Sequence, residues 1–530
     1  MEKHTFDVYN IDYDDSLTWE LICQGKTKGV FQLESSLGKS WSKRVRPRNL
    51  EELAALTALL RPGCLKAIVD GKSMTQHYVD RKNGEEEVTY IHESLEPILN
   101  QTQGVLVYQE QSMKISQKVA GFDLQQADDL RKAIGKKKAD LMSKIKKEFI
   151  KGSENENIVS KEAAEEIFSW IEKSSRYAFN KSHAVSYAIC GYWSAYAKAH
   201  YPVEFYCHCL RHAKNKPDPQ REIRELVSDA KTNDIFILPP CIEEMNEDTC
   251  IINGKIHFGL TDIKSIGVNQ IQKLKQKLEE EEDKLDKKIG EWNWYEFLVR
   301  FSDKIGSSTV IAMVSVGVLS ANKISRNKML DEFDTWTKLT NKERLWVYDQ
   351  HCQWDNLKDA LLSLRPTKKM GGGTFNDKRS EIVKDLIKQT RKPAYSLEDT
   401  PDWVAGIEQN YLGVPITYSK VDSCDTSSAN ATCKDFLNGG KVKDVALAVS
   451  INSVRPYTLK KGQNKGKDMA FLCVEDHTSP LDNVAIFADQ WEKYRNLLYE
   501  GNTVVIYGGE SKRGKYRSDS SLIVERVWQI

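Results

Sequence analysis

The sequence predicts a mixed α and β protein in which a large, mainly helical region precedes a small C-terminal β-barrel. Residues 1–240 contain few glycines and long amphipathic stretches, which is the pattern of packed helices. From residue 441 onward, short apolar and β-branched runs alternate with turn residues, which is the pattern of strands. The 530 residues leave room for about three or four domains. We therefore expect separate domains, with helices first and strands last.

The helical region is predicted from apolar periodicity and chain breakers. Glu51–Leu60 forms one helix, which ends at an Arg-Pro-Gly sequence, and Ser160–Glu172 forms another. Leu124–Ile150 is predicted as a helix with a basic face and a break near Gly135. Thr102–Met113 is apolar enough for a short strand or for the start of a buried helix, and its periodicity fits both.

Residues 241–366 are predicted to begin with a β-hairpin and to continue as helices. Thr249–Ile252 and Ile256–Gly259 flank an Asn-Gly turn, which is a strong hairpin signal. The charge-dense run Leu278–Lys288 is predicted to be a solvated helix. Residues 367–440 are predicted to be a linker and connecting segment, because a triple glycine and a later Ser/Thr/Asn/Gly-rich stretch interrupt the regular pattern.

Residues 441–530 are predicted to form the barrel. Its five strands are expected in short β-rich runs, namely Val445–Ile451, Met469–Glu475, Asn483–Phe487, Thr503–Tyr507 and Ser521–Val527. One helix, Asp489–Tyr499, stands between the third and fourth runs. Five strands with a helix before the last two are typical of the oligonucleotide-binding type of barrel, the OB-fold.

Composition and charge exclude several classes of protein. The net charge is only +1, so any nucleic-acid site has to come from local clustering. No run approaches the length of a membrane span, and the first residues lack the apolar segment of a signal peptide. The 11 cysteines include no CxxC pair, which fits reduced thiols and a cytoplasmic location. Cys207 and Cys209 are interpreted as structural thiols rather than zinc ligands.

Two stretches carry residue types that bind phosphate. The segment Tyr177–Tyr187 places four polar side chains in succession between aromatic residues, namely Asn180, Lys181, Ser182 and His183. This pattern fits a helix N-cap, and it equally fits a pocket for a phosphate or a base. Residues 131–151 hold nine Lys or Arg against two acidic residues, which suits either a polyphosphate or nucleic-acid site or a solvated basic helix.

The acidic and histidine residues do not form a recognisable catalytic centre. Asp12 and Asp14 are spaced like a two-metal carboxylate pair, but no apolar strand leads into them, so we favour helix capping by Asp14, Asp15 or Ser16. His183 lacks an evident nucleophile or carboxylate partner. No P-loop, GxSxG or HExxH pattern is present, and we predict neither catalytic residues nor metal ligands.

Two further stretches point to DNA. Ile263–Ile271 resembles the hairpin of a helix-hairpin-helix, with Lys264 and Gly267 placed to contact a phosphate and Ser265 in place of the other usual glycine. In the barrel, basic residues with interleaved tyrosines gather at two predicted hairpins: Arg455, Tyr457, Lys460, Lys461, Lys465 and Lys467, then Lys512, Arg513, Lys515, Tyr516 and Arg517. This pattern fits single-stranded nucleic acid or two solvated hairpin tips.

Taken in order, these stretches resemble one family, the alpha subunit of bacterial DNA polymerase III, which belongs to the C-family replicative polymerases. The matching runs are Gly29–Ser35, Leu59–Gly63, Tyr108–Gln111, Ala120–Phe122, Ala127–Lys138, Phe179–Ala184, Lys198–Phe205, Leu238–Pro240, Gly259–Gly267 and Tyr411–Pro415. The resemblance is dense between residues 20 and 270, looser to 330, and resumes near Tyr411 and through the barrel.

The resemblance implies an assignment for each domain. Residues 1–240 correspond to the fingers, 241–366 to a little-finger or β-binding-like domain with helix-hairpin-helix contacts, and 441–530 to the OB-fold. The incoming nucleotide is expected to contact Arg131, Lys132, Lys136, Lys181, Ser182, His183 and Tyr187. DNA is expected to contact Lys137, Lys138, Lys264, Gly267, Arg455, Tyr457, Lys460, Lys461, Lys512, Arg513 and Lys515.

The runs that match the family do not include its palm, whose aspartates hold two Mg²⁺ ions, or its phosphoesterase-like domain. We therefore expect the C-terminal half of a split, phage-like polymerase, inactive alone, that binds dNTP and primer-template DNA. A companion chain would carry the palm, thumb, phosphoesterase-like domain and Mg²⁺. A sliding clamp is a further possible partner, although no clamp peptide is recognised around residues 365–400. The alternatives are a non-catalytic DNA-binding replication accessory module and a degenerate structural remnant. The location implied is the cytoplasm of a bacterium or of a phage-infected bacterial host.

Overall fold

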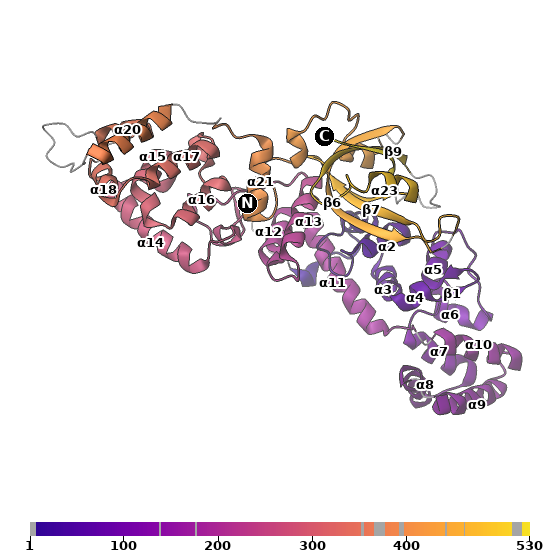
Figure 1. The fold of residues 1–530 in the computed structure, drawn as a ribbon. Coiled ribbons are helices and arrows are strands. Elements are labelled where there is room, and N and C mark those ends of the chain that lie inside the picture. The colour runs from indigo at the N-terminus through magenta and orange to yellow at the C-terminus, as the bar shows by residue number, and fades with distance from the viewer. Residues whose placement is uncertain are drawn as a thin grey trace. The chain divides into compact units, whose positions relative to one another are not determined.

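The structure is a computed structural model that describes residues 7–136, 139–174, 177–350, 354–364, 377–391, 397–439, 443–460, 462–510 and 522–530. The chain forms two compact units, one comprising the residues up to Pro202 and the other essentially the residues from Val203 onward (Figure 1). The boundary between the units lies at Pro202 because Tyr206 and Leu226 belong to the hydrophobic core of the second unit. The end of the fingers at residue 240 stays a prediction.

The first unit is almost entirely helical. Its helices are α1 (Ser16–Cys23), α2 (Ser36–Val45), α3 (Leu50–Leu59), α4 (Pro62–Lys66), α5 (Met74–Lys82), α6 (Glu96–Leu99), α7 (Gln109–Ala120), α8 (Leu124–Lys136), α9 (Ala139–Glu156), α10 (Lys161–Ser174) and α11 (Lys181–His200). Strands β1 (Ile68–Val69) and β2 (Lys72–Ser73) form a small hairpin between α4 and α5. The predicted long helix over 124–150 is therefore two helices, α8 and α9.

Two hydrophobic cores hold this unit together. One core includes Trp19, Leu56 and Tyr192 and joins α1, α2, α3 and α5 to α11. The other includes Phe149 and Phe168, whose rings lie 5.2 Å apart, and joins α7 to α8, α9 and α10. The segment 102–113, predicted as either a strand or a helix start, forms a single bridge at Tyr108 and then enters α7.

Helix α9 passes very close to the end of α7. A Cβ atom at Gly152 of α9 would overlap the backbone carbonyl of Ala120, the last residue of α7. Only glycine lacks that atom, so this close approach requires glycine at position 152. This contact between the backbones of α7 and α9 therefore fixes the position of α9 on the core that contains Phe149.

The helical part of the second unit begins at the boundary itself. Its helices are α12 (Pro202–Ala213), α13 (Pro219–Thr232), α14 (Val268–Leu285), α15 (Trp294–Glu296), α16 (Ser307–Ser315), α17 (Arg326–Thr337), α18 (Asn341–Asp349), α19 (Leu357–Ser363), α20 (Asp377–Arg391), α21 (Pro401–Leu412) and α22 (Cys433–Leu437). Strands β4 (Cys250–Ile252) and β5 (Lys255–His257) confirm the predicted hairpin, and β3 (Ile237–Leu238) pairs with β5. The segment predicted as a linker, 367–440, contains α20, α21 and α22.

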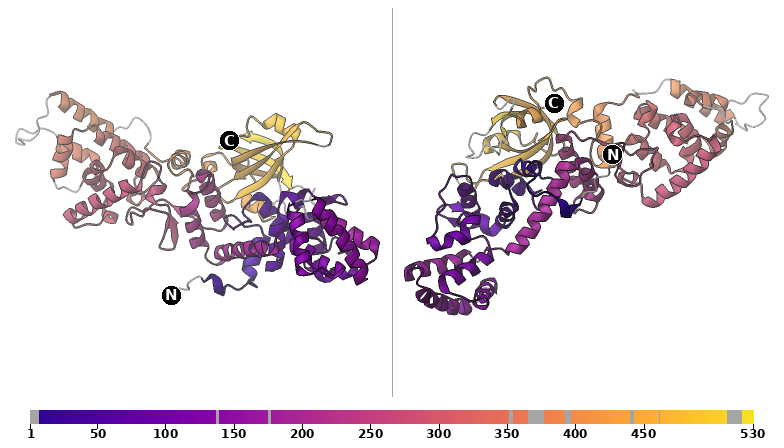
Figure 2. Two further views of the ribbon diagram at one scale, coloured as in Figure 1. Left: turned by 90° about the horizontal axis from the view of Figure 1, so that it is seen from below. Right: turned by 180° about the vertical axis from the view of Figure 1, so that it is seen from behind.

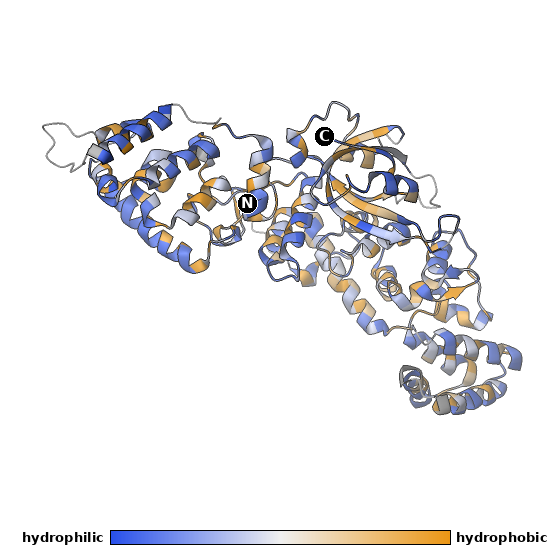
Figure 3. Ribbon diagram, viewed as in Figure 1, coloured by the Kyte–Doolittle hydropathy of each residue, from blue (hydrophilic) through white to orange (hydrophobic). Residues whose placement is uncertain are grey.

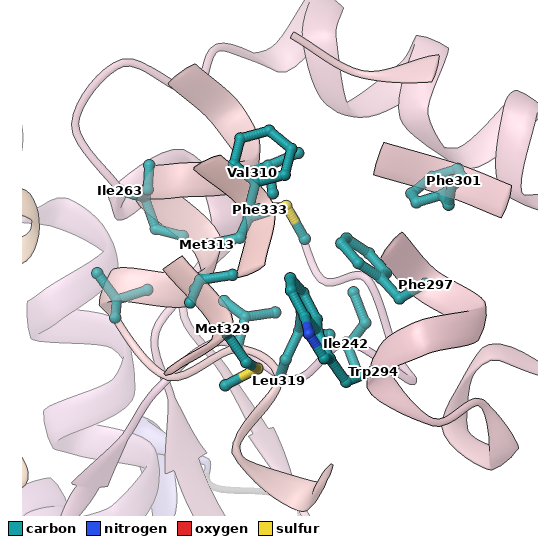
Figure 4. Close-up of a cluster of buried hydrophobic side chains, with 14 of the residues drawn as sticks. Ile242, Ile263, Trp294, Phe297, Phe301, Val310, Met313, Leu319, Met329 and Phe333 are labelled. Carbon is teal, nitrogen blue, oxygen red and sulfur yellow. The ribbon is translucent and has the colours of Figure 1, made fainter. Parts of the chain in front are cut away.

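Aromatic residues fill the centre of this region. Trp294 stacks on Phe297 with ring centroids 5.9 Å apart, and Phe297 meets Phe301 edge-on at 5.5 Å (Figure 4). Ile263, which immediately precedes the predicted DNA-contacting turn, belongs to the same cluster (Figure 4). The turn is therefore anchored to the core by the residue that precedes it.

Helix α14 departs from the prediction of a solvated charged helix. Glu281 in its middle is fully buried. Lys284 donates to its carboxylate at 2.6 Å, Lys304 also forms an ion pair with it, and the Tyr348 hydroxyl donates to it at 3.1 Å. Burial raises the pKa of Glu281, but the hydrogen bonds from these lysines outweigh that effect and lower it. Charge pairing therefore allows one side of this helix to face the core.

The chain ends in the predicted β-barrel. Its elements are β6 (Val445–Thr458), β7 (Asp468–Glu475), β8 (Pro480–Ile486), α23 (Ala488–Tyr494), β9 (Thr503–Glu510) and β10 (Leu522–Gln529). The strands close in the order β10-β8-β7-β6-β9, and α23 stands between the third and fourth strands of the sequence as expected. The barrel is the yellow C-terminal part of the ribbon in Figure 2. Hydrophobic residues are prominent in these strands (Figure 3). The predictions of five strands and of the inserted helix are both confirmed.

Strand β6 is shared by the two sides of the barrel. Its first half pairs with β9, from Val445 opposite Gly508 to Ser450 opposite Thr503. Its second half pairs with β7, and the register shifts between Ile451 and Ser453. Such a bulge bends a strand, which lets β6 pass from one side to the other.

Candidate functional site

The N-terminus of α11 carries a side-chain cap. Capping is one of the two interpretations that the sequence of this segment allows. The side chain of Asn180 accepts a hydrogen bond from the backbone N–H of His183 at 2.9 Å. The Ser182 hydroxyl donates to the same Asn180 oxygen at 2.6 Å. Asn180 is therefore the N-cap, and the Ser182 hydroxyl is engaged in holding it.

A carboxylate from α7 completes this cap. Glu110 accepts from the side-chain amide of Asn180 at 3.0 Å and from the backbone N–H of Lys181 at 2.9 Å. A helix N-terminus attracts anions because its first N–H groups are free and its dipole is positive there. Here an internal carboxylate already occupies that position. An incoming phosphate would therefore be bound by a side chain rather than by this helix end.

The ammonium group of Lys181 is available for that role. It donates to the Gln101 side chain at 3.3 Å and lies 5.7 Å from the centroid of the Tyr108 ring. Among the described residues, no carboxylate lies within ion-pair distance of it. The positive charge of Lys181 is thus held in place by neutral groups and is not neutralised.

Aromatic rings continue along the same side of α11. The His183 ring lies 5.2 Å from Phe179 and 4.0 Å from Tyr187, and Tyr187 lies 5.1 Å from Phe31. We call the surface formed by Phe179, Lys181, His183 and Tyr187 the α11 wall. His183 is exposed, and Tyr187 is half-buried, so the wall presents ring surface to a ligand.

Arg61 holds the start of this wall. Its guanidinium donates to the backbone carbonyls of Ala58 at 2.9 Å and Tyr177 at 3.0 Å, and it lies 3.9 Å from the centroid of the Phe179 ring. Burial lowers the pKa of Arg61 from its usual value. Arg61 therefore ties the loop after α3 to the segment that precedes α11, and its planar group stacks on a ring of the wall.

A cavity of about 190 Å³ lies against the wall. It is lined by Gln32, Ser35, Leu37, Thr57, Leu60, Arg61, Phe179, His183 and Tyr187. Pockets that enclose a whole small ligand generally exceed about 300 Å³, so this one has room for only part of a larger molecule. Its rings, hydroxyls and guanidinium suit a planar polar group such as a base. Lys181 and Ser182 lie at the adjacent helix end and do not line the cavity.

Two predicted phosphate ligands on α8 differ from Lys181, because they are paired with an acidic residue. Arg131 and Lys132 both form ion pairs with Asp128, at 2.7 and 2.8 Å. Hydrogen bonds from Lys132 and Arg131 lower the pKa of Asp128, and the bond that Lys132 donates to Asp128 raises the pKa of Lys132. Neither cation lines the cavity at the wall. The side chain of Lys136, and Lys137 and Lys138 entirely, lie outside the described part of the chain.

The predicted helix-hairpin-helix has only its second helix. Gly267 precedes the first residue of α14, and Ser265 adopts a φ of 79°, the conformation that favours the missing glycine. The backbone N–H of Lys264 donates to Tyr411 at 2.8 Å, and its side chain is exposed. Upstream lie strand β5 and a short 3-10 turn rather than a helix, because the hairpin of β4 and β5 occupies that stretch.

Part of the predicted barrel surface is visible. Arg455 and Tyr457 are exposed near the end of β6 and, two residues apart on a strand, share one face. Lys460 follows the strand and is also exposed. Four further predicted contacts lie outside the described residues, namely Lys461, Lys512, Arg513 and Lys515.

The carboxylates near the N-terminus do not form a metal site. Asp12 accepts a hydrogen bond from the backbone N–H of Asp14 at 2.9 Å, and Asp15 accepts from the backbone N–H of Thr18 at 2.8 Å. Asp15 is thus the N-cap of α1. No three His, Cys, Asp or Glu side chains converge on a possible metal position within the described ranges. The described residues of this chain do not fit the two Mg²⁺ ions that the family resemblance implies.

Two further observations concern zinc binding by cysteines and membrane-spanning helices. The Cys207 thiol donates to the carbonyl of Thr249 at 3.6 Å, and burial raises its pKa, which makes it a poor metal ligand. Within the described ranges, no helix combines the length and apolar character needed to cross a bilayer.

Comparison with known proteins gives a consistent result. Residues 1–157 match the family described as the bacterial DNA polymerase III alpha subunit finger domain. The chain is 35% identical over 517 residues to the DNA polymerase III subunit alpha of Aquifex aeolicus, covering 96% of this chain and 38% of the relative. It is 29% identical to the subunit of Bacillus subtilis over 505 residues, covering 94% and 40%. It is 29% identical to the subunit of Borreliella burgdorferi over 532 residues, covering 99% and 42%.

These similarities confirm the resemblance inferred from the motifs. The chain is related over nearly its whole length to DNA polymerase III alpha subunits and corresponds to their C-terminal part, beginning with the finger domain. It spans about two fifths of the length of the curated relatives. The finger-domain match includes α1 to α9, and the α11 wall follows it.

Two residues at the wall were missed by sequence reasoning. Glu110 and Arg61 both lie in runs that carried the family resemblance, but no local pattern linked them to the start of α11. Their partners at the wall are separated from them by 70 or more residues of sequence. Only the folded contact between the segments reveals their roles.

Proposed function

We propose that this chain is a nucleotide- and DNA-binding part of a replicative DNA polymerase, whose catalytic palm lies outside the residues of this sequence. The observation that carries the proposal is the α11 wall, which combines a cation that no described carboxylate pairs with, a row of rings and an adjoining cavity. The similarity to DNA polymerase III alpha subunits supports the same assignment. In this assignment the ligand of the wall is the incoming dNTP.

Each group of the wall has a chemical role in the proposal. A base or sugar enters the cavity and contacts the rings of His183 and Tyr187, since stacking on aromatic rings is independent of base identity. The triphosphate is held by the ammonium of Lys181, a compact charge suited to phosphate oxygens. Glu110 and Arg61 act as positioning residues, because they fix the helix start and the Phe179 ring rather than contact the nucleotide.

The chemistry of bond formation lies elsewhere in this proposal. Mg²⁺ bound at a palm would activate the primer 3′-hydroxyl and stabilise the leaving pyrophosphate. The described carboxylates of this chain do not converge on such a site. The contribution of this chain is to bind and orient the nucleotide and the DNA, so the chain alone is expected to be inactive in synthesis.

Nucleotide binding is the direct test. Fluorescence anisotropy with a labelled dNTP, in the presence of primer-template DNA, measures the affinity of the full chain. Lys181→Ala is expected to weaken binding by about tenfold, the loss of one charge-assisted phosphate contact. Lys118→Ala removes the same charge from the exposed face of α7 and is the matched control. Equal affinity in the two variants would overturn the assignment of Lys181.

Primer extension tests the division of labour. With Mg²⁺, the four dNTPs and a primed template, the chain alone is expected to give no extension. Extension by the purified chain would contradict a palm that lies outside these residues. A chain that binds DNA, but in which neither the wild type nor any wall variant binds dNTP, would instead be a non-catalytic DNA-binding replication module, which the exposed Arg455 and Tyr457 of the barrel also suit.

A further inference from the structure

A second basic surface lies between α9 and α10, away from the cavity at the α11 wall. An open groove of about 490 Å³ is lined by Ser143, Lys146, Lys147, Ile150, Lys151, Glu154, Lys161 and Glu165. We call it the lysine groove. Its lining contains more lysines than glutamates, and Ile150 is the one apolar residue among the described residues that line it. The surface is therefore positive and polar.

The lysines of α9 in this groove have no acidic partner among the described residues. Lys146, Lys147 and Lys151 are exposed, and no described carboxylate lies within ion-pair distance of any of them. Other lysines nearby are paired, since Lys161 lies 3.2 Å from Glu154 and Lys144 lies 3.9 Å from Glu148. The uncompensated positive charge of α9 is thus concentrated on the side that faces the groove.

The backbone beneath these lysines is firmly placed. Phe149 of α9 is fully buried and packs on Phe168 of α10. Gly152 sits against the backbone of Ala120 at the end of α7. Lys147 and Lys151 are one helical turn apart, a separation of about 6 Å along the axis. The lysines therefore project from a rigid helix at a defined spacing, with flexible stems and mobile charges.

The chemistry of the groove favours a phosphate backbone over other anions. Lysine ammonium groups are point charges that bind phosphate oxygens without a required orientation. No aromatic ring lines the groove, so bases have no stacking surface there. An acidic peptide segment usually also needs apolar pockets for anchoring side chains, and Ile150 alone does not provide them.

We propose that the lysine groove is a second DNA contact, which binds the sugar-phosphate backbone independently of sequence through Lys146, Lys147 and Lys151. The proposal rests on the proposed function only in that the chain works on DNA. It assigns to α9 a role in holding the DNA rather than the nucleotide. Binding here releases counterions, so it weakens steeply as salt concentration rises.

The test is the salt dependence of DNA binding by the full chain. The variant Lys146→Gln/Lys147→Gln/Lys151→Gln removes the charges and keeps most of the side-chain length. Anisotropy of a labelled primer-template across a salt series is expected to show a fall in affinity of about tenfold near physiological salt. The slope of log affinity against log salt is expected to decrease by about 2 to 3, one for each lost phosphate contact.

A matched control separates this effect from a general loss of charge. Lys114→Gln/Lys118→Gln/Lys173→Gln removes as many exposed lysines from α7 and α10 outside the groove. It is expected to leave the slope nearly unchanged. Equal slopes for the two triple variants would overturn the proposal. Circular dichroism melting of both variants excludes unfolding as the cause of any difference.

Further outcomes separate this inference from the proposed function and from a protein ligand. If Lys181→Ala does not affect dNTP binding but the groove variant loses DNA, the proposed function fails and this inference stands. If dNTP binding behaves as expected but the groove variant binds DNA normally, this inference alone fails. Binding of an oligoglutamate peptide that depends on the groove lysines, with unchanged DNA binding, would identify an acidic protein segment as the ligand and overturn the DNA assignment.

Discussion

The α11 wall and the lysine groove are both surfaces of the first unit, but they are constructed in opposite ways. At the wall, Glu110, Asn180 and Arg61 hold the backbone and the rings in one arrangement. In the groove, Lys146 and Lys147 extend from a rigid helix, and no acidic side chain in the described part of the chain pairs with them. The first arrangement suits a small ligand that must be oriented, and the second suits a long anion that need only be held.

The comparison also shows that clustered charge in a sequence is not the same as free charge in a structure. Arg131 and Lys132 belong to the densest basic run, yet Asp128 neutralises much of their charge. Lys146, Lys147 and Lys151 are less densely clustered in the sequence, but no acidic residue pairs with them among the described residues. The functional weight of a basic stretch therefore depends on which acidic residues its helix brings within reach.

The largest effect is expected from a substitution that displaces α9 and, with it, the lysine groove. Gly152→Ala places a methyl group against the Ala120 carbonyl, so α9 has to shift from α7 or strain its backbone. We expect a loss of about 3 kcal/mol in the free energy of unfolding, the upper range for overpacking. Denaturant unfolding measures it, and the groove is expected to lose DNA affinity with it.

Gly406→Ala is the control for that substitution. Gly406 lies within α21, and a Cβ atom built there meets nothing within 4 Å. Because alanine favours helix over glycine, this variant is expected to be stabilised by up to about 1 kcal/mol. A Gly152→Ala protein as stable as the wild type would show that α9 is not held by the close approach to α7.

The second-largest effect is expected from a substitution that disturbs the α11 wall and leaves the lysine groove unchanged. Arg61→Lys keeps the charge but loses the planar fork that reaches two carbonyls and stacks on Phe179. We expect a loss of about 2 kcal/mol in stability, since partly buried carbonyls lose charge-assisted donors. Labelled-dNTP affinity is expected to fall, while the salt slope of DNA binding stays unchanged. A change in the slope without a change in dNTP affinity would contradict the separation of the two surfaces.

The third effect concerns the far end of α11 and depends on pH. Asp15 caps α1 and also lies 2.9 Å from the His200 ring in the last turn of α11. Burial raises the pKa of Asp15, but hydrogen bonds from Thr18 and His200 outweigh it and lower the pKa below its usual value. A depressed carboxylate pKa contributes stability above the unfolded value of about 4, and this contribution is lost as pH falls below it.

Asp15→Asn keeps the cap and removes the charge. At neutral pH we expect a loss of about 1 kcal/mol in the free energy of unfolding. The difference between wild type and variant is expected to shrink as pH decreases below about 4, as the wild-type carboxylate is protonated. Thermal unfolding followed over a pH series measures this, and a difference that grows toward acid pH would contradict the assigned role of the charge.

The smallest effect would sharpen the assignment of the groove. Glu165 is one of the two glutamates that line it, and it is exposed. Glu165→Gln removes a repulsive charge and is expected to increase DNA affinity by about twofold, with little effect on stability, as is usual for exposed charges. Glu166→Gln, an exposed neighbour that does not line the groove, is the control. An equal change in both variants would indicate a general field rather than a groove.

Much of the fold was predictable from local pattern. The barrel strands, the β-hairpin and the caps at Asp15 and Asn180 follow from alternation, turn residues and short polar side chains, all of which act within a few residues. The buried Glu281 was not predictable, because its pairing with Lys304 and Tyr348 depends on tertiary packing. The contacts of Glu110 with the start of α11 are likewise long-range.

Part of the candidate site could have been predicted more accurately. Asp128 precedes Lys132 by four residues on a helix, the spacing of a helical ion pair. The basic run begins at Arg131, so Asp128 lies outside it. By contrast, the orientation of Lys146 and Lys151 toward a groove required knowledge of how α10 packs on α9.

The division of β6 between two partners has a consequence for how the protein is made. The second half of β6 pairs with β7, which follows it closely in the chain, so that hairpin can form as soon as both have been synthesised. Most of the first half pairs with β9, from Val445 opposite Gly508, and the ring closes when β10 is added. A ribosome releasing the chain from its N-terminus therefore exposes an unpaired strand edge until late in translation. This stretch of the nascent chain is where we expect the greatest need for a chaperone.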